Sequence, residues 1–314
     1  MKISYLYPSQ HVVKKDITWL QHLPDNIKIM HNSCDKSCDI IYVTTMGKVE
    51  EALRYKTMYN IPAIAWVWDL PFNSQTEWDL SPTGLIENQS RPSQCIQRAN
   101  ILKNFDLLIS SSKWTQKILK EQFKLDSEQI YFYIDTNELD SVTIKNKTDR
   151  IIQISRYFWN KKFENTIHAT KDLTNEVGLV GIRQGMNYYP LLKQISNKNT
   201  IFYENQTREN TIKLLKSSKI LVSPSVFEGW GISPIEALHC NVPVLLSDLP
   251  VFQEVYEDSV LYHNRFDKDD MKYKLEMLNT DQELQKKILN NGKLKIKDFT
   301  SKLFATRILK AITK

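Results

Sequence analysis

The stretch of sequence that decides the fold is residues 220–254, which read ILVSPSVFEGWGISPIEALHCNVPVLLSDLPVFQE. Its first apolar run, Ile220–Val222, is short and stops at a Ser-Pro pair, which is typical of a buried parallel strand. Further on, Ser233 and Pro234 are typical of a helix start, with serine as the N-cap and proline in the first helical position. Glu236 lies three residues after Ser233 and is expected to complete a capping box. A strand, a loop with two glycines and a helix are therefore predicted in this order.

The start of this helix is a predicted anion site. Backbone N–H groups of the first turn and the helix dipole together favour a phosphate. The residues expected to line the site are Gly229, Trp230, Gly231, Ile232 and Ser233. An alternative stays open because such turns occur in many α/β proteins: Glu228 would then be a solvated loop acid and Glu236 only a helix cap. A second strand ends at Asp248, and residues 249–254 are predicted to form a loop at its carboxyl end, where open α/β sheets place ligands.

Residues 223–255, SPSVFEGWGISPIEALHCNVPVLLSDLPVFQEV, resemble the donor-binding segment of the retaining glycosyltransferases of family 4, with its two glutamates separated by seven residues. The resemblance is specific over most of residues 151–262 and looser over the first half of the chain. It implies an α/β protein of the GT-B fold, with two Rossmann-like domains whose parallel sheets face a cleft. It also implies a C-terminal helix that crosses back to the first domain.

The chain has 314 residues, enough for two domains of about 100–200 residues each. Residues 145–150, KNKTDR, are charged and polar without an apolar residue to pack, and they are the predicted linker. We expect an N-terminal acceptor-side domain over residues 1–148 and a C-terminal nucleotide-sugar-binding domain over residues 149–298. Residues 299–314 are expected to form a helix that packs on the N-terminal domain.

The composition is that of a globular protein, with 41% apolar and 25% charged residues. No apolar run approaches the roughly 20 residues that span a bilayer, and the amino terminus lacks the features of a signal peptide. The four cysteines show no paired metal-ligand pattern, so free thiols are predicted rather than a zinc site. These features predict a cytoplasmic enzyme.

The net charge of +6 resides in the last part of the chain. Residues 265–314 contain 13 Lys and Arg against 7 Asp and Glu, which accounts for the whole excess. A solvated helical face is one explanation. Attraction to an anionic membrane surface or acceptor is the other, since each basic residue near lipid contributes about 1 kcal/mol. The second explanation implies peripheral contact with the cytoplasmic membrane face.

The family resemblance implies roles for two bases that follow the strand predicted at residues 151–155. In the family, an arginine just after this strand and a lysine five or six residues later hold the donor diphosphate. Arg156 and Lys162 match this pattern, with Lys161 as the alternative, since the residue after the lysine is usually glycine and is Phe163 here. An arginine fork and an ammonium group neutralise a departing diphosphate. Without the resemblance, these residues would be surface bases.

The resemblance further implies that Glu228 contacts sugar hydroxyls and that Glu236 binds the ribose hydroxyls. Arg183 and Tyr203 lie at the ends of two predicted short strands and are expected to border the nucleotide base. Two mechanisms are considered for the transfer. The resemblance favours attack on the same face, with the departing phosphate oxygen accepting the proton, over Glu228 as a covalent nucleophile.

The acceptor side is predicted in the first domain. Asp69, in the loop after the strand within residues 61–72, is the candidate to orient or deprotonate the acceptor hydroxyl, and the alternative is an aspartate that caps a turn. Residues 73–97 are polar and interrupted by proline and glycine, and they are predicted to form a long acceptor-side loop. A strand is predicted at residues 102–111.

Together these features predict a retaining, metal-independent transfer of a sugar from a nucleotide diphosphate sugar to a glycan, lipid-linked or protein acceptor. GDP-mannose is favoured over a UDP-sugar, and the donor is a substrate, so no cofactor is expected. A catalytically silent sugar-nucleotide-binding subunit is the alternative, because the first loop lacks glycine and the family's histidine is absent near Asp69. A nucleic-acid binder is disfavoured because the excess charge is confined to the tail.

Overall fold

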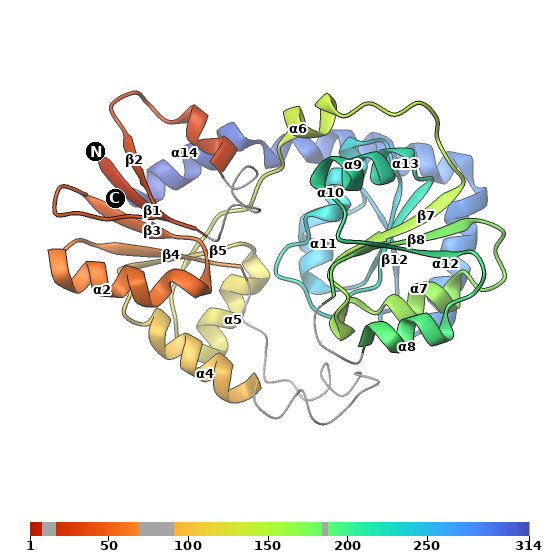
Figure 1. Cartoon of the computed structure of the whole chain (residues 1–314), viewed down its shortest axis with the longest axis horizontal. Coiled ribbons are helices and arrows are strands. Elements are labelled where there is room, and N and C mark those ends of the chain that lie inside the picture. The colour runs from red at the N-terminus through yellow and green to blue at the C-terminus, as the bar shows by residue number, and fades with distance from the viewer. Residues whose placement is uncertain (8–16, 69–90, 184–187, 314) are drawn as a thin grey trace. The chain divides into compact units, whose positions relative to one another are not determined.

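The structure, a computed structural model, describes residues 1–7, 17–68, 91–183 and 188–313. These residues form two compact units. Unit 1 comprises residues 1–7, 17–68, 91–135 and 299–313, and unit 2 comprises residues 136–183 and 188–298. Figure 1 shows that each unit is a sheet flanked by helices.

Unit 1 is built on a six-stranded parallel sheet with strand order β2-β1-β3-β4-β5-β6. Its strands are Lys2–Leu6 (β1), Lys28–His31 (β2), Ile40–Val43 (β3), Ala63–Val67 (β4), Leu107–Ser110 (β5) and Glu128–Gln129 (β6). Its helices are Val49–Tyr59 (α2), Arg91–Leu102 (α4), Lys113–Phe123 (α5) and Ser301–Ile312 (α14), with 3-10 turns at Thr18–His22 (η1) and Met46–Lys48 (η2). The central strands β3 and β4 are buried along their whole length, because helices cover both faces of a parallel sheet.

Unit 2 contains a second six-stranded parallel sheet, with strand order β12-β11-β10-β7-β8-β9. Its strands are Arg150–Ile154 (β7), Glu176–Gly181 (β8), Thr200–Glu204 (β9), Ile220–Ser223 (β10), Val244–Ser247 (β11) and Leu261–His263 (β12). Its helices are Thr136–Ser141 (α6), Phe163–Ala169 (α7), Tyr188–Ile195 (α8), Arg208–Ser217 (α9), Ser233–His239 (α10), Pro250–Tyr256 (α11), Lys268–Thr280 (α12) and Gln282–Lys295 (α13). Trp159–Lys161 (η3) is a 3-10 turn, as is Ile296–Phe299 (η4) at the junction with unit 1. The strand order reverses between β7 and β10, which makes this pair the topological switch point of a Rossmann sheet.

The predicted α/β class with two parallel sheets is confirmed. The apolar runs predicted as strands in unit 2 become β7 to β11, because each is short, rich in β-branched residues and bounded by residues that end a strand. The register of β7 against β10 pairs Ile151 with Ile220, which centres both runs in the core.

The prediction of a loop at residues 249–254 is wrong, since most of this segment lies in α11. Pro250 is the first residue of that helix, where a missing N–H is tolerated. The buried residues of α11 are Val251, Phe252, Val255 and Tyr256, whose spacing gives one helical face. Pro250 therefore marks the start of a helix here and does not interrupt one.

Two predictions in unit 1 are also corrected. Helix α4 begins at Arg91, so the end of the loop predicted at residues 73–97 is helical, and the part of that loop before residue 91 lies outside the described residues. The strand predicted at residues 102–111 covers only Leu107–Ser110, because α4 runs to Leu102 and a turn follows.

The division between the units falls after Asp135 and not after residue 148. Contacts with α9 explain the difference. Lys216 Nζ donates to the carbonyl oxygen of Val142 at 2.7 Å, and Thr148 N donates to that of Ser217 at 2.7 Å. The polar linker predicted from residue 145 is thus fastened to unit 2.

The last helix, α14, packs within unit 1, where the blue ribbon of the C-terminus lies among the red strands of the N-terminus (Figure 1). Phe304 is only 3% exposed. Its ring centroid lies 5.3 Å from Trp66, 5.5 Å from Trp19 and 4.9 Å from Tyr133. The two ends of the chain therefore share one aromatic core.

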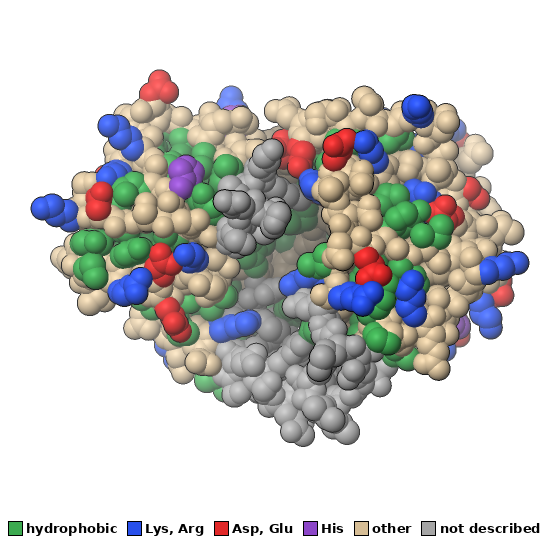
Figure 2. All heavy atoms as spheres, viewed as in Figure 1, with side chains coloured by type: hydrophobic (Ala, Val, Ile, Leu, Met, Phe, Trp, Pro, Cys, Tyr) green, Lys and Arg blue, Asp and Glu red, His purple; other side chains and the backbone are tan. Residues whose placement is uncertain are grey.

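Charged side chains of both signs are interspersed over the face shown in Figure 2, with apolar side chains in small groups between them. No helix of the described segments is long and apolar enough to cross a bilayer.

We predict that Phe304→Ala lowers the free energy of unfolding by about 3–5 kcal/mol, because it removes a buried ring and leaves a cavity. Leu303→Ala is the matched control, since Leu303 is the preceding residue of the same helix and is 38% exposed. Urea denaturation of the three proteins measures the difference. Equal losses in both variants would contradict the aromatic core as the basis of α14 packing.

Candidate functional site

The loops that follow β7 and β10 meet at the carboxyl edge of the unit 2 sheet. Val226 N donates to the carbonyl oxygen of Asn160 at 2.9 Å, and Asn160 Nδ2 donates to that of Phe227 at 3.2 Å. Ser233 Oγ donates to the carbonyl oxygen of Ile154 at 3.2 Å. Because this is the switch point of the sheet, it is the expected position of a ligand.

Glu228 is held by one of its two carboxylate oxygens. Lys161 Nζ donates to Glu228 Oε1 at 2.6 Å, and Ser225 Oγ donates to the same atom at 2.9 Å. The side chain of Glu228 is 17% exposed and that of Lys161 is 10% exposed. In the part of the chain that the structure describes, no hydrogen bond reaches Oε2. The carboxylate is therefore fixed in place with one oxygen left for a ligand.

The structure distinguishes the two adjacent lysines. Lys162 has φ +49°, in the left-handed region, and its Nζ lies 3.4 Å from Glu164 Oε1. Lys161 faces Glu228, and Gln153 Nε2 donates to the Lys161 carbonyl oxygen at 2.6 Å. A left-handed residue is where glycine is favoured. The backbone of Lys162 therefore has the conformation that glycine favours, and Lys161 is the lysine that contacts Glu228.

The predicted cap of α10 is wrong. Ser233 is the first helical residue, the N-cap position is Ile232, and no side chain caps this end. The Ser233 hydroxyl instead donates to a carbonyl group of β7. Glu236 accepts hydrogen bonds from Arg208, and no capping box forms. The serine joins the helix to the neighbouring strand, a tertiary contact that local pattern does not reveal.

The glycine loop before α10 is tightly packed. Gly231 has φ +85°, and a Cβ at this position would lie 2.6 Å from Phe252 Cε1. Tyr256 Oη donates a hydrogen bond to the Gly231 carbonyl oxygen. Trp230 is 2% exposed and Gly229 is buried, whereas Ile232 is half-buried. The Trp230 side chain therefore belongs to the core, and a ligand contact there falls to the backbone.

Arg156 follows β7 directly and is exposed. Within the described residues, no hydrogen bond or ion pair holds its guanidinium. The next residue, Tyr157, is fixed, since its N donates to the carbonyl oxygen of Ile182 at 2.9 Å. Arg156 is thus a cation on a fixed backbone at the carboxyl edge of the sheet.

Glu236 is buried, with a side chain 5% exposed, and it is paired with a residue that the sequence analysis missed. Arg208 NH1 donates to Glu236 Oε2 at 3.0 Å, and NH2 donates to Oε1 at 2.8 Å. Arg208 Nε donates to Glu138 Oε2 at 3.0 Å. Burial opposes the charge on Arg208, but the two carboxylates outweigh it and raise the pKa of the guanidinium above its ordinary value.

Arg183 and Tyr203 lie in different environments. Arg183 Nε donates to Glu204 Oε2 at 2.5 Å, and its guanidinium lies 4.1 Å from the ring centroid of Tyr189. The hydrogen bond to Arg183 holds the pKa of Glu204 below its usual range. Tyr203 Oη donates to Glu176 Oε1 at 2.9 Å, and Glu176 is the first residue of β8. The Tyr203 hydroxyl is thus directed to the amino end of the sheet, which corrects its predicted position beside the ligand.

Asp69 lies outside the described residues. Among those that are described, no group of three His, Cys, Asp or Glu side chains could hold a metal ion. Ser225, Asn160 and Arg208 were missed by the sequence analysis. Little in the sequence points to Arg208: it follows a predicted strand and lies at the start of a predicted helix.

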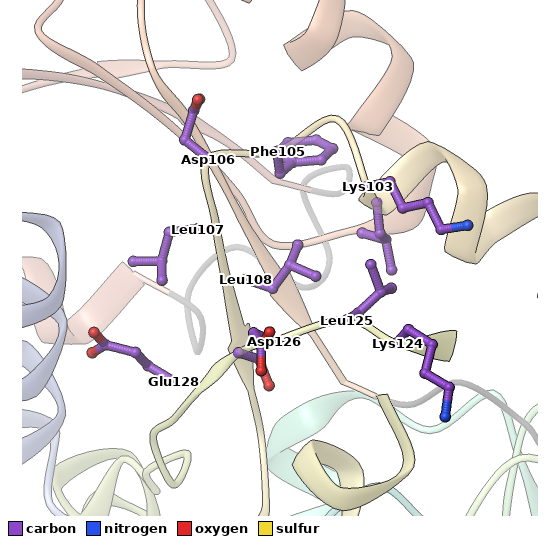
Figure 3. A pocket seen from close by; sticks show the side chains of 11 residues that line it. Lys103, Phe105, Asp106, Leu107, Leu108, Lys124, Leu125, Asp126 and Glu128 are labelled. Atoms are coloured by element: carbon purple, nitrogen blue, oxygen red, sulfur yellow. The ribbon is translucent and has the colours of Figure 1, made fainter. Parts of the chain in front are cut away.

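A pocket of about 370 Å³ lies in unit 1 and is shown in Figure 3. Its lining comes from the end of α4, the start of β5 and the segment that leads into β6, with Leu108 and Leu125 in its wall. These are the amino ends of strands, whereas open α/β sheets bind ligands at the carboxyl ends. The pocket is therefore no part of the candidate site.

Comparisons with known proteins bear on the same half of the chain. Residues 135–295 match the family model described as glycosyl transferases group 1. The chain is 30% identical over 156 residues to the O-antigen chain mannosyltransferase RfbU of Salmonella typhimurium, an alignment that covers 48% of this chain and 44% of that protein. It is 26% identical over 170 residues to the N,N'-diacetylbacillosaminyl-diphospho-undecaprenol alpha-1,3-N-acetylgalactosaminyltransferase of Campylobacter jejuni, covering 52% of this chain and 44% of that protein. The chain thus spans less than half the length of these two relatives.

Solved structures share the fold. Anabaena HepE in complex with UDP-glucose has a TM-score of 0.77 at 15% identity, covering 100% of this chain and 99% of that one. Sucrose-phosphate synthase from Thermosynechococcus elongatus has a TM-score of 0.73 at 15% identity, covering 88% and 73%. At these identities the likeness concerns the fold alone, and it confirms the predicted GT-B class.

We predict that Gly231→Ala destabilises the protein by about 2 kcal/mol, since a side chain at positive φ is strained and the new methyl group meets Phe252. Gly47→Ala is the control, because the nearest atom to its new methyl group would be Thr45 Oγ1 at 3.9 Å. Thermal unfolding measures both. A stable Gly231→Ala protein would show that the loop is not constrained as described.

Proposed function

Because the chain belongs to the glycosyl transferases group 1 family, we propose that it is a glycosyltransferase that moves a sugar from a nucleotide diphosphate sugar to a glycan or lipid-linked acceptor. In this reaction the bond from the anomeric carbon to the donor diphosphate breaks. The acceptor hydroxyl oxygen forms a bond to the same carbon and loses its proton. The site must therefore hold sugar hydroxyls and neutralise the negative charge that develops on the diphosphate.

The observation that carries the proposal is the half-occupied carboxylate of Glu228. Lys161 and Ser225 fix Oε1, whereas Oε2 has no hydrogen-bond partner among the described residues. A fixed carboxylate oxygen is a strong acceptor for hydroxyl groups. Glu228 in this role orients the transferred sugar at the switch point.

Arg156 and Lys161 supply the positive charge. Arg156 is exposed at the carboxyl end of β7, and Lys161 lies on the loop that starts there. A guanidinium fork and an ammonium group together offset about two negative charges on a diphosphate. The backbone N–H groups near Gly231 and Ser233 are further candidate donors to the diphosphate.

We propose that the transfer retains the anomeric configuration and needs no metal. The ion pair with Lys161 supports transfer without a covalent intermediate on Glu228, because a carboxylate that shares its charge with an ammonium group is a weaker nucleophile. The departing phosphate oxygen then accepts the acceptor's proton while both groups lie on the same face of the sugar.

The donor that we favour is GDP-mannose. The name of RfbU states mannosyl transfer, which supports mannose as the sugar of this chain. The alternative is a UDP-sugar, as bound in the HepE complex. The acceptor that we favour is a growing or lipid-linked glycan, since the printed names of the relatives include an O-antigen chain and a diphospho-undecaprenol.

A lipid-linked acceptor would bring the enzyme to an anionic surface. On α13, Lys286, Lys287 and Lys293 are exposed, and so is Leu294, which is 66% exposed. These residues are our candidates for peripheral membrane contact.

A panel of GDP, UDP and their sugars tests the donor. The matching nucleotide at 100 times its Kd should stabilise the protein by about 2.7 kcal/mol, measured as a thermal shift. Glu228→Gln should reduce sugar transfer by about 100-fold without loss of fold. Lys213→Ala is the control, because Lys213 is 47% exposed and pairs with Glu209 on α9. Binding without transfer to any acceptor would favour a catalytically silent sugar-nucleotide-binding subunit.

The two lysines provide a matched pair of variants. We expect Lys161→Gly to lose transfer by about 100-fold or more, since a charge that stabilises the leaving group is removed. Lys162→Gly should keep transfer, because glycine suits the left-handed backbone at that position. Initial rates at saturating donor give the comparison. The reverse order of effects would reassign the phosphate-binding lysine to Lys162.

A further inference from the structure

We propose that Gln153 is a positioning residue that holds the Lys161 ammonium group in place for the diphosphate of the donor. The inference rests on the proposed function, in which Lys161 neutralises that diphosphate. It adds a buried amide inside the sheet, and a threonine behind it, to the residues that determine how tightly the diphosphate is held.

Gln153 interrupts the apolar run of β7, where it lies between Ile152 and Ile154. Ile152 is fully buried, and Gln153 is itself only 1% exposed. A side-chain amide at such a depth costs free energy unless its polar atoms have hydrogen-bond partners. An apolar residue would pack in this strand without that cost, so the partners of the amide indicate what it does.

Both ends of the Gln153 amide are used. Nε2 donates to the carbonyl oxygen of Lys161 at 2.6 Å, and Oε1 accepts a hydrogen bond from Thr166 Oγ1 at 2.6 Å. A carbonyl oxygen can only accept, so Nε2 faces Lys161 and the amide has one orientation. Thr166 is fully buried on α7. The amide therefore ties the turn after β7 to the helix that follows it.

This contact fixes the backbone from which the Lys161 side chain extends. Lys161 is the last residue of η3. The residue before it, Asn160, is bonded to the loop after β10, since its carbonyl oxygen accepts from Val226 N at 2.9 Å and its Nδ2 donates to the carbonyl oxygen of Phe227 at 3.2 Å. The turn is thus held from the sheet on one side and from the Glu228 loop on the other.

A fixed backbone limits the positions that the Lys161 ammonium group can take. An ammonium group has three donors. In the described part of the chain, Glu228 accepts from Nζ at 2.6 Å, which uses one of them. The remaining donors are those that we assign to the oxygens of the diphosphate.

A purely structural role would also explain a buried amide between a turn and a helix, and the diphosphate separates the two explanations. Calorimetry on the whole chain gives the Kd of GDP and of guanosine, or of UDP and of uridine if the thermal-shift panel selects UDP. The wild type should bind the diphosphate more tightly than the nucleoside. Gln153→Met should reduce this preference by about 10–100-fold, because a small displacement of a binding group is costly. The affinity for the nucleoside should not change.

The variant Lys161→Met supplies a second background for this measurement. It removes the ammonium group and keeps a side chain of similar length. Because Gln153 acts through that group, Gln153→Met should cost no further affinity for the diphosphate when Lys161→Met is already present. An equal loss in both backgrounds would overturn the proposal and assign Gln153 to structure only.

Two buried threonines provide matched variants if Gln153→Met does not fold. Thr166→Val removes the hydroxyl that holds the amide and should reduce the diphosphate preference, whereas Thr166→Ser keeps a hydroxyl and should restore it. Thr170, at the end of α7, is equally buried, but its Oγ1 donates to the carbonyl oxygen of Thr166 at 2.7 Å and not to Gln153. Thr170→Val should lower the melting temperature and leave the preference unchanged.

The outcomes distinguish this inference from the proposed function. A wild type that binds diphosphate and nucleoside equally would overturn both, and so would a preference that persists in Lys161→Met. A preference that Lys161→Met abolishes, but that Gln153→Met and Thr166→Val both retain, would overturn the role of Gln153 alone. Loss of the preference in Thr170→Val to the same extent as in Thr166→Val would also overturn that role, since any loosening of α7 would then suffice.

Discussion

The ion pair between Lys161 and Glu228 is the interaction on which the candidate site depends. It joins the loop after β7 to the loop after β10 at the one place where the strand order of the unit 2 sheet reverses. An ion pair that is largely buried stabilises a fold only when further hydrogen bonds satisfy both partners. Ser225 does so for Glu228, and Gln153 fixes the backbone of Lys161. The surrounding contacts of Asn160 hold the two loops at hydrogen-bonding distance.

The two glutamates of the central segment, Glu228 and Glu236, lie in similar environments. Each is partly or wholly withdrawn from solvent and each is paired with a cation from a different part of unit 2, Lys161 for Glu228 and Arg208 for Glu236. The pairing fixes the orientation of both carboxylates. Such preorganisation lowers the cost of binding, because the acceptors need not be ordered when the donor arrives.

The two units differ in what they share with other proteins. The family match at residues 135–295 coincides with unit 2, which holds the whole candidate site. Unit 1 is held together by its own aromatic core, in which Phe304 of the last helix contacts Trp19 and Trp66.

The sequence by itself determined the α/β class, most strands of unit 2 and the segment that holds Glu228 and Glu236, because short apolar runs and a glycine loop are local signals. It misplaced what depends on distant partners. Ser233 was predicted to cap a helix, but its hydroxyl donates to a carbonyl group of β7. Residues 249–254 were predicted to form a loop, but most of them lie in α11, whose apolar face is buried. Only the tertiary structure placed Lys161 against Glu228 and gave Lys162 a left-handed backbone, and only it brought Arg208 to Glu236. Local sequence patterns predict periodicity and helix caps. Contacts between residues far apart in the sequence form only when the strands have assembled into the sheet.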